Sequence, residues 1–218
     1  MGALGLGKRL RAVAEEVEGR CLADVGCDHG KVSLVCLLEG KVDKVIACDI
    51  SSKSLQKAIE LAKTYGASKI DFRVGDGLEV LNDNEADCVV IAGMGGNEIM
   101  SILSKNVPQG IKKIVLSPHR NAIELRKFLE KNRLYIARDY KVEECGKFYD
   151  IIVAEPADGR DCSLGRKELL LGKNTVGEDF DNYIEFMRRK SDDLPSRGAN
   201  SEQAKLYREI VEIADASK

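Results

Sequence analysis

The fold of this chain depends on one stretch, Leu22-Ala23-Asp24-Val25-Gly26-Cys27-Asp28-His29-Gly30. A short apolar run ends in an acidic residue, a turn with two glycines four residues apart follows, and residues 31–38 continue as an apolar segment. Glycine has no Cβ and tolerates positive φ, so a ligand can approach the backbone of such a turn closely. The N-terminus of a following helix would add partial positive charge at the same place. The stretch therefore predicts a strand, a ligand-binding turn and a helix.

Strands and helices alternate along the chain around this stretch. Short apolar runs predict strands at residues 21–25, 42–48, 70–74, 86–92 and 111–116. Apolar positions at helical spacing predict helices at residues 6–18, 31–38, 51–65, 97–103 and 121–131. Only a short gap separates residues 134–143 from residues 148–155, which predicts an antiparallel hairpin. The expected fold class is α/β and Rossmann-like, a seven-stranded, mostly parallel sheet with one antiparallel edge strand.

The last quarter of the chain is expected to form a helical appendage. Apolar residues recur at helical spacing in two segments, Phe180, Tyr183, Ile184 and Met187 in the first and Leu206, Ile210 and Ile213 in the second. Residues 192–201 contain Pro195 and Gly198, which predicts a connecting loop. We therefore expect a sheet domain over residues 1–156 and a C-terminal helical hairpin over residues 157–218.

The composition excludes several classes of protein. The chain has no apolar run of about 18 residues, so we expect no membrane partner. Its seven cysteines are scattered and form no C-x-x-C pair, which indicates reduced thiols and a cytoplasmic location. It has only two histidines, so no metal site is expected.

Positive charge is concentrated in one part of an otherwise nearly neutral sequence. Between Lys105 and Lys141 the chain carries ten basic residues against three acidic ones, although its net charge is −2. A patch of one sign attracts polyanions. The same residues can equally form the solvated face of a helix, so the patch alone does not decide between the two interpretations.

Acidic residues stand at the strand ends where ligands bind in such sheets. Asp49 ends the second strand, and a carboxylate there accepts hydrogen bonds from ribose hydroxyls. Asp76 ends the third strand, within reach of the exocyclic amine of an adenine. Asp24 and Asp28 would repel a pyrophosphate but attract an ammonium and a sulfonium group. The charges therefore favour S-adenosyl-L-methionine over NAD as the cofactor.

Each of these residues also has a purely structural interpretation. Asp49 and Asp76 can serve as helix caps or turn formers. His29 can be a hydrogen-bonded structural histidine, and the cysteines fit core positions.

Three motifs of this chain resemble the TrmK family of bacterial tRNA (adenine-22-N1)-methyltransferases. They are Asp24-Val25-Gly26-Cys27-Asp28-His29, Gly93-Met94-Gly95-Gly96 and Gly146-Lys147-Phe148-Tyr149-Asp150-Ile151, and the Lys8-Arg9-Leu10 lead-in is also similar. The resemblance covers residues 6–155. It implies a class I methyltransferase domain, S-adenosyl-L-methionine as methyl donor, tRNA as partner and a C-terminal helical appendage that helps to hold the tRNA.

The candidate site residues fall into three groups. The cofactor group is Asp24, Gly26, Cys27, His29, Gly30, Asp49, Ile50, Asp76, Gly77 and Gly93. The candidate catalytic residues are Asp28, Met94 and His119. The candidate substrate-binding residues are Gly95, Gly96, Pro118, Arg120, Arg126 and Lys127. Two alternatives remain open: a methyltransferase for a small molecule or a protein, and a non-catalytic nucleotide-binding module.

Overall fold

Seven strands form a single sheet in the computed structural model, which describes residues 4–193 and 202–217. In chain order they are β1 (Cys21–Val25), β2 (Lys44–Asp49), β3 (Ile70–Val74), β4 (Cys88–Ala92), β5 (Lys113–Ser117), β6 (Leu134–Glu144) and β7 (Lys147–Pro156). Their order across the sheet is β3-β2-β1-β4-β5-β7-β6. The chain thus crosses over after β3, which creates the switch point beside β1 and β4 where such sheets bind ligands.

The first five strands are parallel, and β7 is antiparallel to both of its neighbours. A mixed sheet with one antiparallel strand on this side is confirmed, and the pairing places β7 between β5 and the edge strand β6. Cys145 and Gly146 join the two strands with φ values of 52° and 72°. Two consecutive positive φ values are typical of the tight turns that suit the twist of a hairpin.

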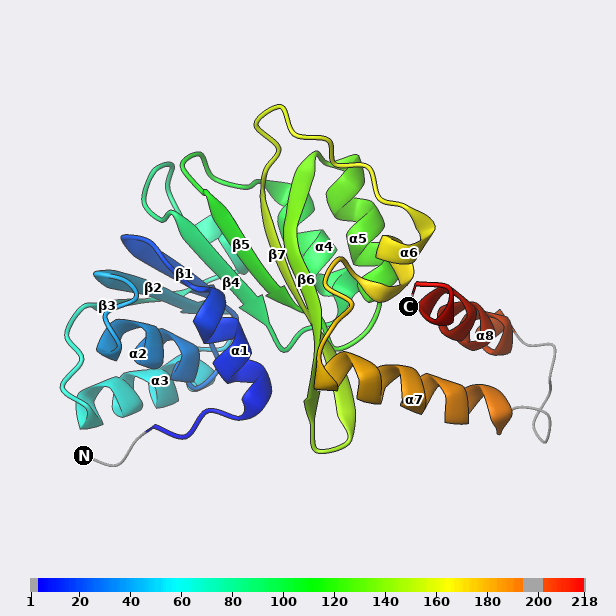
Figure 1. The fold of residues 1–218 in the computed structure, drawn as a ribbon. Coiled ribbons are helices and arrows are strands. Elements are labelled where there is room, and N and C mark those ends of the chain that lie inside the picture. Colours follow the sequence, from blue (N-terminus) through cyan, green and yellow to red (C-terminus); the bar gives the residue numbers. More distant parts are fainter. Residues whose placement is uncertain (1–3, 194–201, 218) are drawn as a thin grey trace.

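Five helices cover the two faces of the sheet (Figure 1). Their bounds are α1 (Lys8–Glu16), α2 (Lys31–Leu38), α3 (Ser52–Thr64), α4 (Gly96–Lys105) and α5 (Ala122–Lys131). One core layer joins α1, α2 and α3 to the sheet, and a second joins α4, α5 and the short helix η1 (Gly77–Val80) to the opposite face. Every residue of β1 is buried, as expected for a central strand covered on both faces.

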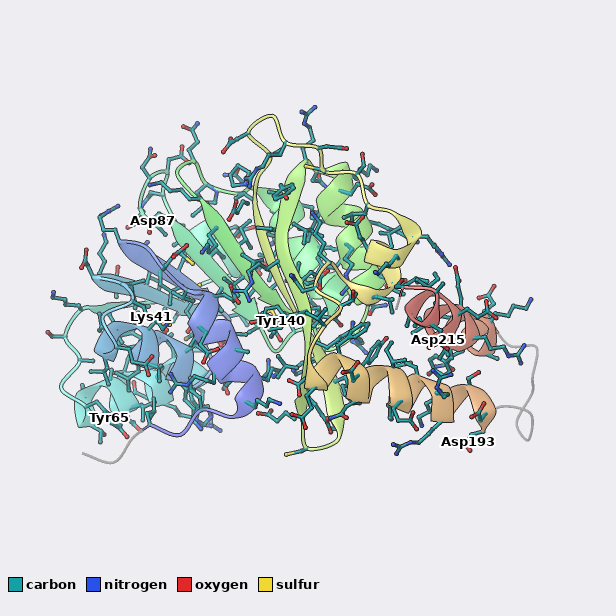
Figure 2. All side chains as sticks on the ribbon, in the orientation of Figure 1. Lys41, Tyr65, Asp87, Tyr140, Asp193 and Asp215 are labelled. Carbon is teal, nitrogen blue, oxygen red and sulfur yellow. The ribbon has the colours of Figure 1, made fainter. Side chains whose placement is uncertain are left out.

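The first helix also anchors the hairpin. Tyr140 of β6 lies beside α1 (Figure 2), and its hydroxyl donates a hydrogen bond of 2.9 Å to the carboxylate of Glu16. The main-chain N–H of Arg9 donates to Glu144 at 3.1 Å. These contacts hold both ends of α1 against β6.

Three helices follow the sheet: α6 (Arg166–Leu171), α7 (Glu178–Asp192) and α8 (Glu202–Asp215). The sequence patterns did not indicate α6, which has only six residues. An apolar cluster of α6, α7 and α8 residues also takes in Ile123 of α5 and Phe148 of β7, and α7 and α8 extend from the sheet as a pair (Figure 1). Most of the loop expected at residues 192–201 lies outside the described residues.

Candidate functional site

A cavity of about 580 Å³ opens at the carboxyl ends of the parallel strands, around the turn that follows β1. Twelve residues assigned to the site from the sequence line it: Asp24, Gly26, Cys27, Asp28, His29, Asp49, Ile50, Asp76, Gly77, Gly93, Met94 and His119. The turns after all five parallel strands therefore converge on one space, as expected for the carboxyl ends of a parallel sheet. The functional roles of these residues stay predictions.

The turn between β1 and α2 requires its glycines. Gly26 has φ of +68°, and a Cβ there would lie 2.0 Å from Cε of Met94. Gly30 has φ of +65° and lies against α3, where a Cβ would come within 2.9 Å of the Ala58 side chain. Gly26 therefore opens the cavity floor, whereas Gly30 lets α2 begin close to α3 and does not line the cavity.

Asp24 is a buried carboxylate at the centre of the cavity wall, with 4% of its surface exposed. Its Oδ2 accepts hydrogen bonds from the N–H and the hydroxyl of Ser33, at 3.1 and 2.5 Å. Burial raises the pKa of Asp24 to about 6, although the bonds from Ser33 oppose the shift. A carboxylate held at this cost is well placed to receive a cation, which would restore its ionised form.

Asp49 serves the turn and the cavity together. Its Oδ2 accepts the main-chain N–H of Asp28 at 3.1 Å, and its Oδ1 accepts that of Ser51 at 2.8 Å. The structural interpretation of Asp49 is therefore correct, and its two oxygens still border the cavity. Ile50 beside it is 74% exposed, an apolar surface available to a flat ring.

Asp76 is paired in this structure. Nζ of Lys105 lies 2.5 Å from Oδ2 of Asp76 and 3.0 Å from the carboxylate of Glu79. All three side chains are substantially exposed, so these pairs are weak and exchange readily with solvent or ligand. Lys105 is accordingly less available to a polyanion than its place in the basic segment suggested.

The Gly93-Met94-Gly95-Gly96 segment divides into two parts. Gly93 is exposed on the cavity floor with φ of +86°, and Met94 lines the cavity beside it. Gly95 and Gly96 are buried, and a Cβ on Gly96 would lie 2.6 Å from the carbonyl oxygen of Asn121. The assignment of Gly95 and Gly96 to substrate binding is therefore wrong, because both are buried and pack beneath the loop after β5.

That loop delivers one residue to the cavity. The carbonyl of Arg120 accepts the N–H of Gly96 at 2.9 Å, and the N–H of His119 donates to the carbonyl of Met94 at 2.9 Å. His119 lies at the cavity, Arg120 is exposed beside it, and Pro118 is buried. The assignment of Pro118 to substrate binding is wrong, because Pro118 is buried and does not line the cavity.

The site assignment missed seven residues that line the cavity, and Arg9 and Lys31 are the two charged ones among them. Arg9 lines the cavity, its guanidinium carbon lies 5.3 Å from the ring centre of Tyr149, and its Nη1 is buried. The sequence did contain a signal, because Arg9 precedes the buried Val13 by four residues and so lies on the apolar face of α1. A charged residue on such a face is a candidate functional residue.

Arg126 was expected to bind substrate, and the structure contradicts this. Its side chain is 1% exposed, and its guanidinium holds Asp139 through two hydrogen bonds of 2.6 and 2.9 Å. It also contacts Asp150, which in turn pairs with the buried Lys141. The basic segment between Lys105 and Lys141 is therefore not one continuous surface patch.

Cysteine and metal chemistry find no support in the described residues. Cys27 lines the cavity, but burial raises the pKa of its thiol well above the ordinary value, so it stays protonated. No group of three histidine, cysteine or acidic side chains within residues 4–193 and 202–217 is placed to hold a metal ion. None of the helices in these ranges is long and apolar enough to cross a membrane.

A doubly wound sheet with acidic strand ends, in place of a phosphate-binding loop, has the architecture of a Rossmann-like methyltransferase. Residues 6–152 match the family described as methyltransferase domain. The chain is 38% identical over 162 residues to the tRNA (adenine(22)-N(1))-methyltransferase of Bacillus subtilis, an alignment that covers 72% of this chain and 68% of that protein. The chain thus belongs to the TrmK family of tRNA (adenine(22)-N1)-methyltransferases, as the motifs predicted.

Solved structures agree with this assignment over nearly the whole chain. The crystal structure of the Bacillus subtilis m1A22 tRNA methyltransferase TrmK superposes with a TM-score of 0.75 at 30% identity and covers 98% of both chains. A putative tRNA (m1A22) methyltransferase of Streptococcus pneumoniae gives a TM-score of 0.86 at 25% identity, over 97% of this chain and 99% of that one. The pneumococcal protein has also been solved in complex with S-adenosyl-L-methionine.

Proposed function

We propose that this protein transfers a methyl group from S-adenosyl-L-methionine to N1 of adenine 22 in tRNA. The observation that carries the proposal is the acidic lining of the cavity, where Asp24, Asp28, Asp49 and Asp76 meet around a glycine turn. Such a lining suits the ammonium, the sulfonium and the ribose hydroxyls of this cofactor and disfavours a pyrophosphate. A cytoplasmic location fits a tRNA substrate and is part of the same proposal.

The residues present fit the cofactor one by one. Asp24 offers a buried negative charge to the ammonium, and Asp49 offers carboxylate oxygens to the ribose at the end of β2. Ile50 offers an exposed apolar surface to the adenine ring, and Asp76 an acceptor to its exocyclic amine. Gly26 and Gly93 leave room for close approach because they carry no side chain.

The reaction makes modest demands on the protein. The cofactor supplies an electrophilic methyl group, whose bond to sulfur breaks as the lone pair on N1 forms the new N–C bond. Neutral adenine already carries that lone pair, so the site needs no strong base and acts by alignment and exclusion of water. Asp28 and His119 both line the cavity, and a carboxylate beside the target base would favour the cationic product.

The tRNA would be held outside the cavity by exposed basic side chains. Arg120 lies beside the cavity and Lys127 on the next helix, both exposed, whereas Arg126 is withdrawn from this surface. Contacts of this kind go to phosphates and make binding strongly salt-dependent. N1 lies on the pairing edge, so the target base has to present that edge unpaired to the cavity.

The decisive experiment measures methyl transfer from labelled S-adenosyl-L-methionine to two unmodified transcripts of one tRNA, with A or G at position 22. We expect label in the A22 transcript only. Equal label in both transcripts would support methyl transfer to tRNA but reject adenine 22 as the target. Cofactor binding by calorimetry without label in either transcript would favour a small-molecule or protein substrate. Binding of NAD in place of S-adenosyl-L-methionine would favour the non-catalytic module.

A further inference from the structure

Two side chains that line the cavity, Arg9 and His119, both lie beside the ring of Tyr149, although the three residues come from distant parts of the chain. Arg9 comes from α1, His119 from the loop after β5 and Tyr149 from β7. The rings of His119 and Tyr149 have centres 5.7 Å apart, and the guanidinium carbon of Arg9 lies 5.3 Å from the Tyr149 ring centre. Packing of α1 on the hairpin therefore places Arg9 beside the aromatic ring of Tyr149.

Arg9 and His119 border a space above Gly93. A Cβ built on Gly93 would lie 4.0 Å from Nη2 of Arg9 and 4.0 Å from Nε2 of His119, so both nitrogens face the region that glycine leaves open. Gly93 itself is exposed. This space adjoins the part of the cavity bordered by Asp24 and Gly26, so a group held here lies next to the cofactor region.

Arg9 has hydrogen-bonding capacity that the described residues leave unused. Its Nη1 is buried, and no partner for it exists among residues 4–193 and 202–217. Burial lowers the pKa of Arg9, although an arginine remains charged at neutral pH. A buried donor without a partner is costly, and such groups occur where a ligand or a water completes the hydrogen bond.

His119 is held in its neutral form. Partial desolvation of its ring, followed by the positive charges of Arg9 on α1 and Lys147 on β7, lowers the pKa of His119, and Glu98 on α4 opposes the shift. A neutral imidazole carries both a donor and an acceptor, whereas an imidazolium only donates. Adenine presents an amine donor beside ring-nitrogen acceptors, so the neutral ring matches its edge.

We propose that Arg9 is a positioning residue of the methyl-acceptor subsite, where its free N–H groups and its contacts with Tyr149 and His119 orient the target purine. This inference rests on the proposed function. Arg9 donates to an acceptor on the base or its ribose-phosphate, because a guanidinium offers only donors. Its positive charge also adds to the desolvation that lowers the pKa of His119, which favours a ring nitrogen able to accept from the exocyclic amine.

The test compares Arg9→Gln and Arg9→Lys with Arg11→Gln in the full chain. Arg11 lies on the same helix, pairs with Glu39 at 2.6 Å and does not line the cavity, so it is a matched control. Three quantities are measured: the Kd of S-adenosyl-L-methionine by calorimetry, kcat and KM with tRNA, and the His119 pKa by NMR titration. The titration is readily assigned because His29 and His119 are the two histidines of the sequence.

For Arg9→Gln we expect kcat/KM with tRNA to fall about 10- to 100-fold, the loss typical of a hydrogen bond to a charged group. The cofactor Kd stays within about twofold, since the acceptor subsite is separate from Asp24 and Asp49, and the His119 pKa rises. Arg9→Lys keeps the charge, so His119 titrates as in the wild type while KM for tRNA increases. Arg11→Gln matches the wild type in all three measurements.

Two results would overturn the proposal. One is a loss of cofactor affinity in Arg9→Gln as large as the loss of transfer rate, which would place Arg9 in the cofactor site or the scaffold. The other is an unchanged His119 titration together with an unchanged KM for tRNA. If Arg9→Gln fails to fold, the KM of Arg9→Lys for tRNA is the deciding measurement, and an unchanged KM would reject the positioning role of Arg9. Absence of tRNA methylation by the wild type would reject the proposed function, and the titration would still decide whether Arg9 controls His119.

Discussion

Asp24 is a single residue whose burial lowers the stability of the ligand-free protein at neutral pH and prepares the site for a cationic ligand. Its carboxylate is buried with a pKa of about 6, against an ordinary value of 3.8. Because the folded-state pKa is the higher one, the contribution of Asp24 to stability is fully present below pH 4. It is lost as the pH rises through 6, at a cost on the order of 2–3 kcal/mol.

Replacement of Asp24 should therefore separate stability from binding. Asp24→Asn is expected to raise the free energy of unfolding of the ligand-free protein at pH 8 by about 1–3 kcal/mol, since the amide oxygen still accepts from Ser33. The same variant should lose the rise in melting temperature that S-adenosyl-L-methionine gives the wild type. In the wild type that rise should be larger at pH 7 than at pH 5. An Asp24→Asn variant that keeps cofactor affinity would contradict the role of Asp24.

Gly96 supports a second prediction at this scale. A Cβ at this position would lie 2.6 and 2.8 Å from the carbonyl oxygens of Asn121 and Arg120, which are backbone atoms and cannot move independently. Gly96→Ala should lower the free energy of unfolding by about 1–3 kcal/mol and displace His119, with a corresponding loss of methyl transfer. Gly165→Ala is the control, because a Cβ there meets only an ordinary contact of 3.5 Å. Equal stability of the two variants in urea unfolding would show that the loop accommodates the change.

At the scale of elements, a buried cluster of charges joins α5 to the hairpin and to the C-terminal helices. Arg126 bridges Asp139 of β6 and Asp150 of β7 and donates to the carbonyl of Leu169 at 3.2 Å. Lys141 pairs with Asp150 and lies 4.6 Å from the ring centre of Tyr183 on α7. Burial disfavours the Asp150 carboxylate, but Lys141 and Arg126 outweigh it and hold the pKa of Asp150 at about 2. Two positive and two negative side chains thus form one largely buried cluster.

Two adjacent residues of α5 should accordingly respond in opposite ways. Arg126→Met leaves Asp139 buried without its partner and should cost about 3–5 kcal/mol of stability. Lys127 lies on the exposed side of α5, so Lys127→Glu should change the free energy of unfolding by no more than about 0.5 kcal/mol. It should weaken tRNA binding and lower the slope of log K against log salt concentration by about one. Urea unfolding and tRNA binding at several salt concentrations measure both effects. Selective loss of tRNA affinity in Arg126→Met, with stability retained, would restore the original assignment of Arg126.

At the scale of the whole molecule, the division at residue 156 remains a prediction that the packing makes testable. Phe180 and Tyr183 of α7 pack in the same apolar cluster as Ile123 of α5 and Phe148 of β7. We expect Phe180→Ala to lower stability by about 3–5 kcal/mol and to leave a single unfolding transition in calorimetry, because the C-terminal helices share a core with the sheet. A separate low-temperature transition would instead show that residues 157–218 unfold as an independent domain.

The sequence predicted local features well. The bounds of β1 and β3 match the expected strands at 21–25 and 70–74, because each is a short apolar or alternating run closed by glycine or an acidic residue. The acidic strand ends pointed to a single cavity, and the structure brings Asp24, Asp49 and Asp76 together there. Each of these inferences needs only the alternation of strands and helices, which places all carboxyl ends of parallel strands on one edge.

The burial of charged residues could not be predicted from the sequence, because it depends on which distant elements pack together. Charge counting placed Arg126 and Lys141 on a surface patch, but the hairpin brings Asp139 and Asp150 within reach and removes both cations from solvent. Arg9 shows the opposite effect, because tertiary packing brings this cation to the cavity. Packing of α1 on the hairpin places Arg9 beside Gly93, which is more than 80 residues later in the chain. Local periodicity and strand-end chemistry therefore determined the fold class and the cofactor side of the site. The tertiary structure alone decided which charges face the acceptor side, because opposite charges distant in sequence neutralise one another only after the sheet has formed.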